Sequence, residues 1–208
     1  ESIQLIEKLL TQERVTHSGQ FFNVKDARLS PKSVQQPAPP IWIGARGPKA
    51  IKRAAEMGYH LMATIGPDPA PLYLDTLKEC GRNPKDYKIA QLRMVYCAES
   101  EDKAWDECQE HLFHLLEFYQ DILSEANDAE GDDAPLPVSK PEDMRNSVLA
   151  DHFMIGTPDQ VCEKMSQFQN DFNCTDLIMG TQFPGLAPDK GTEALGLFAE
   201  KVMPRFRN

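Results

Sequence analysis

The segment from Pro39 to Gly58 constrains the fold of this chain more than any other stretch of its sequence. Residues 41–43 (Ile-Trp-Ile) form a short apolar run behind a double proline, and β-branched and aromatic residues of this kind favour a buried strand. A tight turn over 44–47 follows, and Pro48 then stands at the first position of a helix, where a missing N–H is tolerated. Gly58 supplies the left-handed residue that ends a helix. The segment therefore predicts a strand, a turn and a helix in succession.

The turn of this unit is a candidate anion site. It places the fixed positive charge of an arginine beside the free N–H groups at a helix start, which suits a phosphate or a carboxylate. Its glycines would let an anion approach the backbone closely. The residues of this candidate site are Gly44, Ala45, Arg46 and Gly47. The alternative is a tight connection that carries a surface arginine and binds nothing.

The composition excludes several classes of protein. A chain of 208 residues can build one domain with a real core, and 41% hydrophobic and 26% charged residues are typical of a soluble globular protein. A formal net charge of −10 argues against nucleic acid or an anionic membrane as a partner. No apolar run approaches the roughly 18 residues that a membrane-spanning helix needs. We therefore expect a single soluble domain over residues 1–208.

The cysteines are scattered and odd in number, and none of them has the spacing of a zinc knuckle. Reduced thiols in the cytoplasm are the plain interpretation. The five are Cys80, Cys97, Cys108, Cys162 and Cys174. The chain opens on Glu1 and enters an amphipathic helix at once, so we expect the sequence to continue from an element that precedes it.

Strands alternate with helices along most of the chain. After a first helix over 2–10 and a hairpin over 15–24, the pattern predicts strands at 41–43, 59–64, 89–97 and 176–180. It predicts helices at 48–57, 70–80, 103–126, 158–170 and 191–202. Such alternation indicates a parallel sheet with its site at the carboxyl ends of the strands. A closed (β/α)8 barrel needs eight units in about 250 residues, so the four counted here make half a barrel or a small open sheet.

Two further groups of residues are candidates for chemistry. Thr64, Thr181 and Gln182 lie at or just past strand ends; Gln182 would donate to a cofactor carbonyl or, in the alternative, brace its own loop. Cys108, His111 and His114 share one side of a helix, but no carboxylate completes a metal site and we expect none. An acidic run lacks the ordered spacing of a calcium loop and predicts a solvated loop: Asp128, Glu130, Asp132 and Asp133.

Four motifs, taken in their order and spacing, resemble the carboxyl-terminal part of the bacterial luciferase-like flavin monooxygenases. The first is Gly19-Gln20-Phe21-Phe22, followed by proline-rich sequence that leads into residues 39–45. The second is Ala54-Ala55-Glu56-Met57-Gly58, although Tyr59-His60 replaces the Asp-Gly usual after it. The third is Ile155-Gly156-Thr157-Pro158-Asp159-Gln160-Val161, and the fourth comprises Asp176–Met179 with Leu197–Pro204.

The resemblance implies a (β/α)8 barrel of which this chain holds about the last four units. It implies a flavin-dependent monooxygenase that takes reduced FMN from a separate flavin reductase, O2, and a small hydrophobic organic substrate. It also implies a homo-oligomer, a mobile lid over residues 124–149, and a flavin-phosphate site in the turn 44–47, with Thr64 and Gln182 as further cofactor contacts. It assigns no catalytic residue, since much of the pocket would lie in the first half of the barrel.

Two other functions stay open beside this one. The first is a deazaflavin-dependent dehydrogenase of the same superfamily, which would move a hydride without oxygen. The second is a non-catalytic flavin-binding or interaction protein, in which exposed sheet edges pair with another chain.

Overall fold

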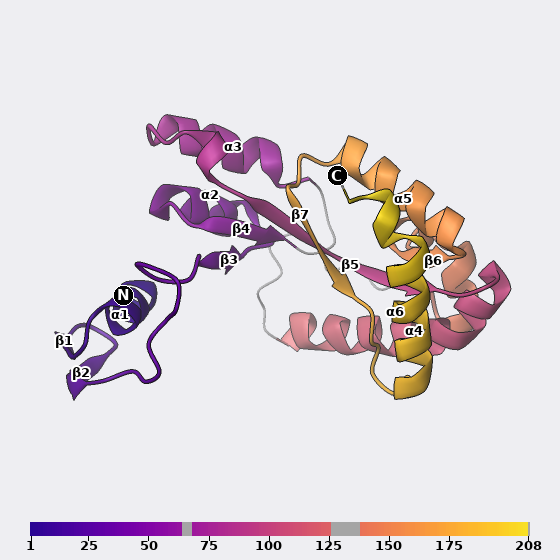
Figure 1. The fold of residues 1–208 in the computed structure, drawn as a ribbon, viewed down its shortest axis with the longest axis horizontal. Coiled ribbons are helices and arrows are strands. Elements are labelled where there is room, and N and C mark those ends of the chain that lie inside the picture. The colour runs from indigo at the N-terminus through magenta and orange to yellow at the C-terminus, as the bar shows by residue number, and fades with distance from the viewer. Residues whose placement is uncertain (64–67, 126–137, 208) are drawn as a thin grey trace. The chain divides into compact units, whose positions relative to one another are not determined.

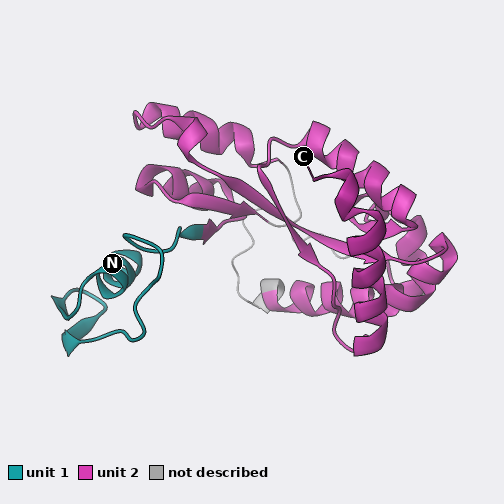
Figure 2. Cartoon of the chain, viewed as in Figure 1, with its two compact units in different colours: residues 1–42 teal, residues 43–208 magenta. Residues whose placement is uncertain are grey.

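The computed structural model describes residues 1–63, 68–125 and 138–207. The chain divides into two compact units, residues 1–42 and residues 43–208 (Figure 2), where the sequence analysis expects one domain. Within the described residues, no helix combines the length and the apolar character that crossing a membrane requires.

The first unit consists of helix α1 (Ser2–Thr11) and the antiparallel hairpin β1 (Val15–Ser18) and β2 (Asn23–Ala27). The predicted helix and hairpin are both confirmed. The carboxylate of Glu1 accepts hydrogen bonds from the backbone N–H groups of Phe21 (3.0 Å) and Phe22 (2.8 Å), which ties the start of the helix to the hairpin turn.

The second unit is built around a five-stranded sheet (Figure 1). Its strands are β3 (Trp42–Gly44), β4 (His60–Ala63), β5 (Ile89–Cys97), β6 (Met154–Gly156) and β7 (Asp176–Gly180). The strand β5 is the centre of the sheet. It pairs in parallel with β4 and β7 along its first part and with β6 along its last three residues. The four predicted strands are confirmed, and the short strand β6 is an addition that the sequence analysis missed.

The helices of this unit are α2 (Pro48–Met57), α3 (Ala70–Glu79), α4 (Glu101–Glu125), α5 (Pro158–Asp171) and α6 (Pro188–Lys201), with short 3-10 turns η1 (Pro84–Asp86), η2 (Pro141–Asn146), η3 (Ala150–His152) and η4 (Met203–Arg205). Four of the five α-helices of this unit, all except α4, carry proline at one of their first two positions. Gly58 ends α2 in the left-handed conformation, at φ 76°, as predicted. Helix α6 begins three residues before the predicted 191, since Pro188 occupies its first turn.

Three apolar clusters hold the sheet and helices together. One joins the sheet to α2 and α3 through Ile51, Tyr73 and Leu77, and a second joins it to α5 and α6 through Val161 and Phe198. The third lies around α4, where the fully buried side chains include Leu112, Met144 and Phe183. Full burial of a large apolar side chain contributes about 1.5–3 kcal/mol, so the residues that clamp β5 between helices dominate the stability of this unit.

One charge is buried within β5. Arg93 is 2% exposed, and its guanidinium carbon lies 4.7 Å from the ring centroid of Phe168 and 5.2 Å from that of Phe172. Burial lowers the pKa of Arg93 from its ordinary value. The rings of Phe168, in α5, and Phe172, which follows α5, make cation–π contacts with Arg93. These contacts compensate for part of the lost hydration of its charge.

Candidate functional site

The loops after the strands form the edge at which a site is expected. The strands β4, β5 and β7 are parallel, so their carboxyl ends point toward the same edge of the sheet. The turn 45–47 follows β3, the residues 98–100 follow β5, and the loop 181–187 follows β7. Residues 64–67 come next after β4 in the sequence and lie outside the described residues, and the predicted site residue Thr64 is one of them.

The turn after β3 has a defined backbone. The N–H of Ala45 donates to the carbonyl of Met62 at 3.0 Å, which extends the pairing of β3 with β4 beyond the end of the strand. The carbonyl of Gly47 accepts from the N–H groups of Ala50 and Ile51, both at 3.1 Å, so that Gly47 is the N-cap of α2. The turn is thus held on both sides, and the first N–H groups of α2 point out of the helix beside it.

Within the part of the chain that the structure describes, packing gives no reason for glycine at either glycine of this turn. Gly47 has φ −90°, which any residue adopts, and an added Cβ there would meet no described atom within 4 Å. An added Cβ on Gly44 would meet only the Met62 methyl at 3.6 Å, an ordinary contact. Both positions leave open space against the backbone. Glycine at such places is typical of close approach by a ligand.

Arg46 is exposed and makes no ion pair or hydrogen bond with the part of the chain that the structure describes. Its guanidinium is therefore available to a ligand. A planar guanidinium beside helix N–H groups recognises phosphate or carboxylate through charge-assisted hydrogen bonds. Gly44, Ala45, Arg46 and Gly47 are contiguous in this turn, and their role as an anion site stays a prediction.

Gln182 takes the second of its two predicted roles in the structure. Its Nε2 donates to the carbonyl of Leu186 at 2.8 Å, across the loop after β7. The N–H of Leu186 donates to the carbonyl of Phe183 at 3.1 Å, and Gly185 has φ 81°. Residues 183–186 therefore form a hydrogen-bonded type II β-turn, which favours proline at its second position and glycine at its third. The carboxamide of Gln182 braces its own loop.

The histidines on α4 do not form a metal site. Cys108 is fully buried, and burial raises the pKa of its thiol. The ring of His111 packs against Gly185, whose added Cβ would lie 3.1 Å from Nδ1, and His114 is exposed. Across residues 1–63, 68–125 and 138–207, no three His, Cys, Asp or Glu side chains gather closely enough to hold a metal ion. The acidic run 128–133 lies outside the described residues.

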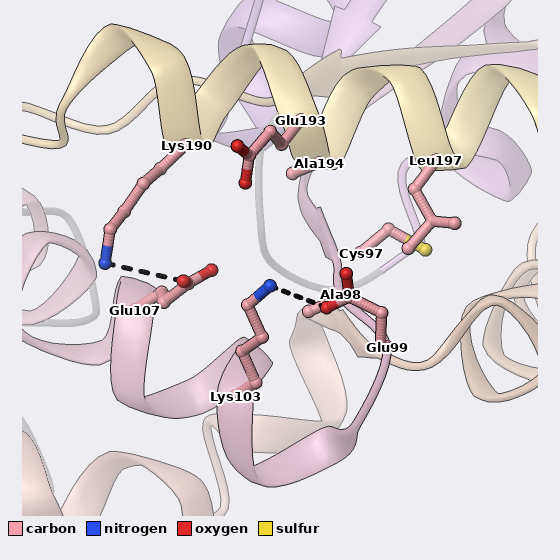
Figure 3. A pocket seen from close by; sticks show the side chains of 9 residues that line it. All are labelled: Cys97, Ala98, Glu99, Lys103, Glu107, Lys190, Glu193, Ala194 and Leu197. Carbon is pink, nitrogen blue, oxygen red and sulfur yellow. Dashed lines mark hydrogen bonds and ion pairs between the residues drawn. The ribbon is translucent and has the colours of Figure 1, made fainter.

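A small polar pocket of about 60 Å³ lies between α4 and α6 (Figure 3). Its lysines are both neutralised: Lys103 Nζ lies 2.6 Å from a carboxylate oxygen of Glu99, and Lys190 Nζ lies 3.4 Å from one of Glu107. The sequence analysis missed the pocket because its walls come from separate segments. Its volume suits a few water molecules and is far below that of a cofactor site.

The described end of the predicted lid is anchored. Of residues 124–149, those from 126 to 137 lie outside the described residues, whereas η2 is described. Met144 in η2 is fully buried, and Arg145 contacts Glu101 (Nη2 to Oε1, 3.1 Å) and Asp102 (Nη1 to Oδ1, 2.6 Å) at the start of α4. Glu101 also accepts a hydrogen bond from Gln160 at 2.8 Å. These contacts fix η2 to the start of α4, and Glu101 in turn joins α4 to α5.

Arg145→Ala is expected to release η2 locally while lowering the free energy of unfolding by no more than about 1 kcal/mol, because the ion pairs are half-exposed and screened by water. The hydrogen bond from Gln160 is the main reason that the pKa of Glu101 lies below its ordinary 4.5; partial burial opposes it and Arg145 adds to it. The contacts that Glu101 makes with Arg145 and Gln160 therefore stabilise the fold fully above about pH 4.5. This stabilisation is lost as the pH falls through the lowered pKa of Glu101.

Hydrogen exchange of the amides in residues 138–149 measures this release. The control is Lys140→Ala, which removes a looser ion pair of the same segment, Lys140 with Asp143 at 4.0 Å. Equal exchange in the two variants would show that Arg145 does not anchor the segment.

Comparison with known proteins identifies relatives of the whole chain. The family described as luciferase-like monooxygenase matches residues 1–172. The chain is similar to an F420-dependent glucose-6-phosphate dehydrogenase of Microbacterium testaceum, at 25% identity over 100% of this chain and 60% of that protein. It is also similar to the oxygenase component of a flavin-dependent trigonelline monooxygenase of Acinetobacter baylyi, at 25% identity over 74% of this chain and 45% of that protein.

Solved structures resemble the chain along its length. The monooxygenase RslO1 from Streptomyces bottropensis superposes with a TM-score of 0.72 at 21% identity, over 99% of this chain and 60% of that one. The oxygenating constituent of 3,6-diketocamphane monooxygenase from Pseudomonas putida, solved in complex with FMN, gives 0.68 at 18% identity, over 98% of this chain and 61% of that one. The predicted α/β fold, part of a (β/α)8 barrel, is confirmed.

The chain spans less than two thirds of the length of these proteins, between 45% and 61%. The relatives divide between enzymes named for flavin and enzymes named for F420, a deazaflavin.

Proposed function

Because the chain belongs to the family of luciferase-like monooxygenases, we propose that it is part of a flavin-dependent monooxygenase that holds FMN by its phosphate in the turn 44–47. The reaction would use reduced FMN, delivered by a separate flavin reductase, together with O2 and a small hydrophobic organic substrate. Reduced flavin, when bound, supplies the activation of O2. The residues of this chain bind and orient the cofactor and keep water away from it.

One observation carries this proposal. The turn 44–47 combines two glycines that packing does not explain with an arginine that has no partner among the described residues, directly before a helix N-terminus. Each feature alone fits a plain βα connection, whereas all of them together fit a phosphate site. The phosphate would be held by Arg46 and by backbone N–H groups, as Gly44, Ala45 and Gly47 leave room for it.

The other predicted contacts have different roles in the proposal. Thr64, which lies outside the described residues, would be a further cofactor contact. Gln182 would act through the shape of the loop 181–187, since its own carboxamide bonds to Leu186. The lid would comprise the residues before η2, with η2 as its fixed end.

A second candidate function is a dehydrogenase that uses the deazaflavin F420. The observation in its favour is that two F420-dependent relatives align with all of this chain, whereas the flavin-dependent relative from Acinetobacter baylyi aligns with 74% of it. A cofactor titration separates the two candidates.

Arg46→Ala is expected to weaken FMN binding by about tenfold or more, since it removes a charge-assisted hydrogen bond to phosphate. The measurement is quenching of FMN fluorescence by the purified chain, with F420 titrated in parallel. The control is Arg53→Ala. Arg53 is also exposed, but it lies within α2, away from the N-terminus of that helix. Equal losses in both variants would mean that net charge and not the turn attracts the cofactor. A folded chain that binds neither cofactor would overturn the proposal for this polypeptide.

A further inference from the structure

We propose that Gln182 is a positioning residue that, together with Gly191 of α6, locks the loop 181–187 into one conformation before any cofactor binds. The importance of this loop for a cofactor rests on the function proposed above, whereas the lock itself is a property of the free protein.

The first part of the lock is the carboxamide of Gln182. Its Nε2–H reaches across the loop to the carbonyl of Leu186 at 2.8 Å, and Leu186 in turn donates to Phe183 at 3.1 Å. Two hydrogen bonds therefore close the loop on itself. Phe183 and Leu186 are 1% and 4% exposed, so that both closing residues are also buried in the cluster around α4.

The second part is the absence of a side chain at Gly191. This buried residue lies in the first turns of α6, and an added Cβ would collide with Oε1 of Gln182 and lie 3.2 Å from its Cδ. Real Cβ atoms essentially never make such a collision, so a methyl group at 191 would push the carboxamide away from Leu186. Glycine inside a helix lowers stability by about 0.5–1 kcal/mol relative to alanine. At position 191 the missing side chain leaves the space that the carboxamide of Gln182 occupies.

Two more contacts brace the same loop from α4 and β5. An added Cβ on Gly185 would lie 3.1 Å from Nδ1 of His111, so the ring of His111 closes over the turn. The ring of Phe183 lies 6.1 Å from that of Tyr96, whose hydroxyl donates to Glu107 at 3.0 Å. The loop is therefore held from three elements, and a ligand at the carboxyl edge of β7 would meet a surface that is already ordered. Preorganisation of this kind removes part of the ordering cost of binding.

Three variants of the full chain test the lock without any ligand: Gln182→Ala, Gly191→Ala and the double variant. Hydrogen exchange of the amides in residues 181–187 is expected to become about fivefold faster in each single variant, the factor for loss of one part-buried hydrogen bond. The double variant is expected to be no faster than the single ones, since both changes remove the same contact. Additive effects, or wild-type exchange in Gly191→Ala, would refute the lock.

Gly196→Ala is the matched control, because Gly196 belongs to the same helix and has no atom within 4 Å of an added Cβ. It is expected to leave the loop unchanged. Should Gly191→Ala fail to fold, Gln182→Met keeps the size of the side chain and removes its amide, and it must give the same faster exchange.

The FMN titration then separates the lock from the proposed function. If the wild type binds FMN, Gln182→Ala and Gly191→Ala are expected to weaken binding by the same factor, whereas Arg46→Ala weakens binding and leaves loop exchange unchanged. If the wild type binds no cofactor, but both variants lose protection of the loop amides, the proposed function is refuted and the lock stands.

Discussion

Gly156→Ala is expected to lower the free energy of unfolding by about 2–4 kcal/mol, a sum of backbone strain and a broken helix cap. Gly156 has φ 146°, and an added Cβ would lie 2.5 Å from Oε1 of Gln160. That oxygen accepts from the N–H of Thr157 at 2.9 Å, while the hydroxyl of Thr157 accepts from the N–H of Gln160. A methyl group at 156 would therefore open the capping box of α5 and disturb the hydrogen bond from Gln160 to Glu101.

Denaturation in urea measures the loss, with Gly81→Ala as the control. Gly81 also has a positive φ, 71°, but no atom of the described residues lies within 4 Å of an added Cβ. Gly81→Ala thus reports the backbone strain alone, about 1 kcal/mol. If Gly156→Ala costs no more than Gly81→Ala, the contact with Gln160 contributes nothing to stability.

Phe153→Ala is expected to cost about 3–5 kcal/mol, because it removes a large side chain that is 1% exposed and leaves a cavity in the cluster around α4. Phe153 also ends the segment that returns from the predicted lid, and its carbonyl accepts from Lys164 Nζ at 3.0 Å. Loss of its packing should therefore loosen the segment as well as the core.

The same urea series measures this effect, and Val148→Ala is the control. Val148 belongs to the same segment but is 72% exposed, so its truncation should change stability by less than about 0.5 kcal/mol. A cost below about 1 kcal/mol for Phe153→Ala would contradict the packing of this segment against α4.

Elements that depend on local chemistry were predictable from the sequence. The helix from Pro48 to the left-handed Gly58 and the cap at Thr157 follow from the preferences of single residues at helix ends. The strand 89–97 was predicted with its observed bounds, since seven of its nine residues are apolar and only Gln91 and Arg93 interrupt them.

Elements that depend on distant partners were not predictable. The strand β6 has only three residues and exists through its pairing with Val95, Tyr96 and Cys97, far away in sequence. The contact of Gln182 with Gly191 and the polar pocket between α4 and α6 likewise join segments that sequence patterns do not connect. The turn 44–47 was proposed as a site from a local pattern, and that role stays a prediction, whereas the hydrogen bond of Gln182 to Leu186 required the structure.

The position of β5 in the sheet makes the order of folding matter. This one strand pairs with residues near 61, 154 and 176, so most of its hydrogen bonds wait for segments made long after it. Closure of such long loops is slow, and during synthesis β5 is a nine-residue, mostly apolar strand with open edges, the kind of segment that pairs with other chains and aggregates. Arg93 lies in the middle of this strand, and we expect a charge at such a position to oppose pairing with other chains until Phe168 and Phe172 cover it.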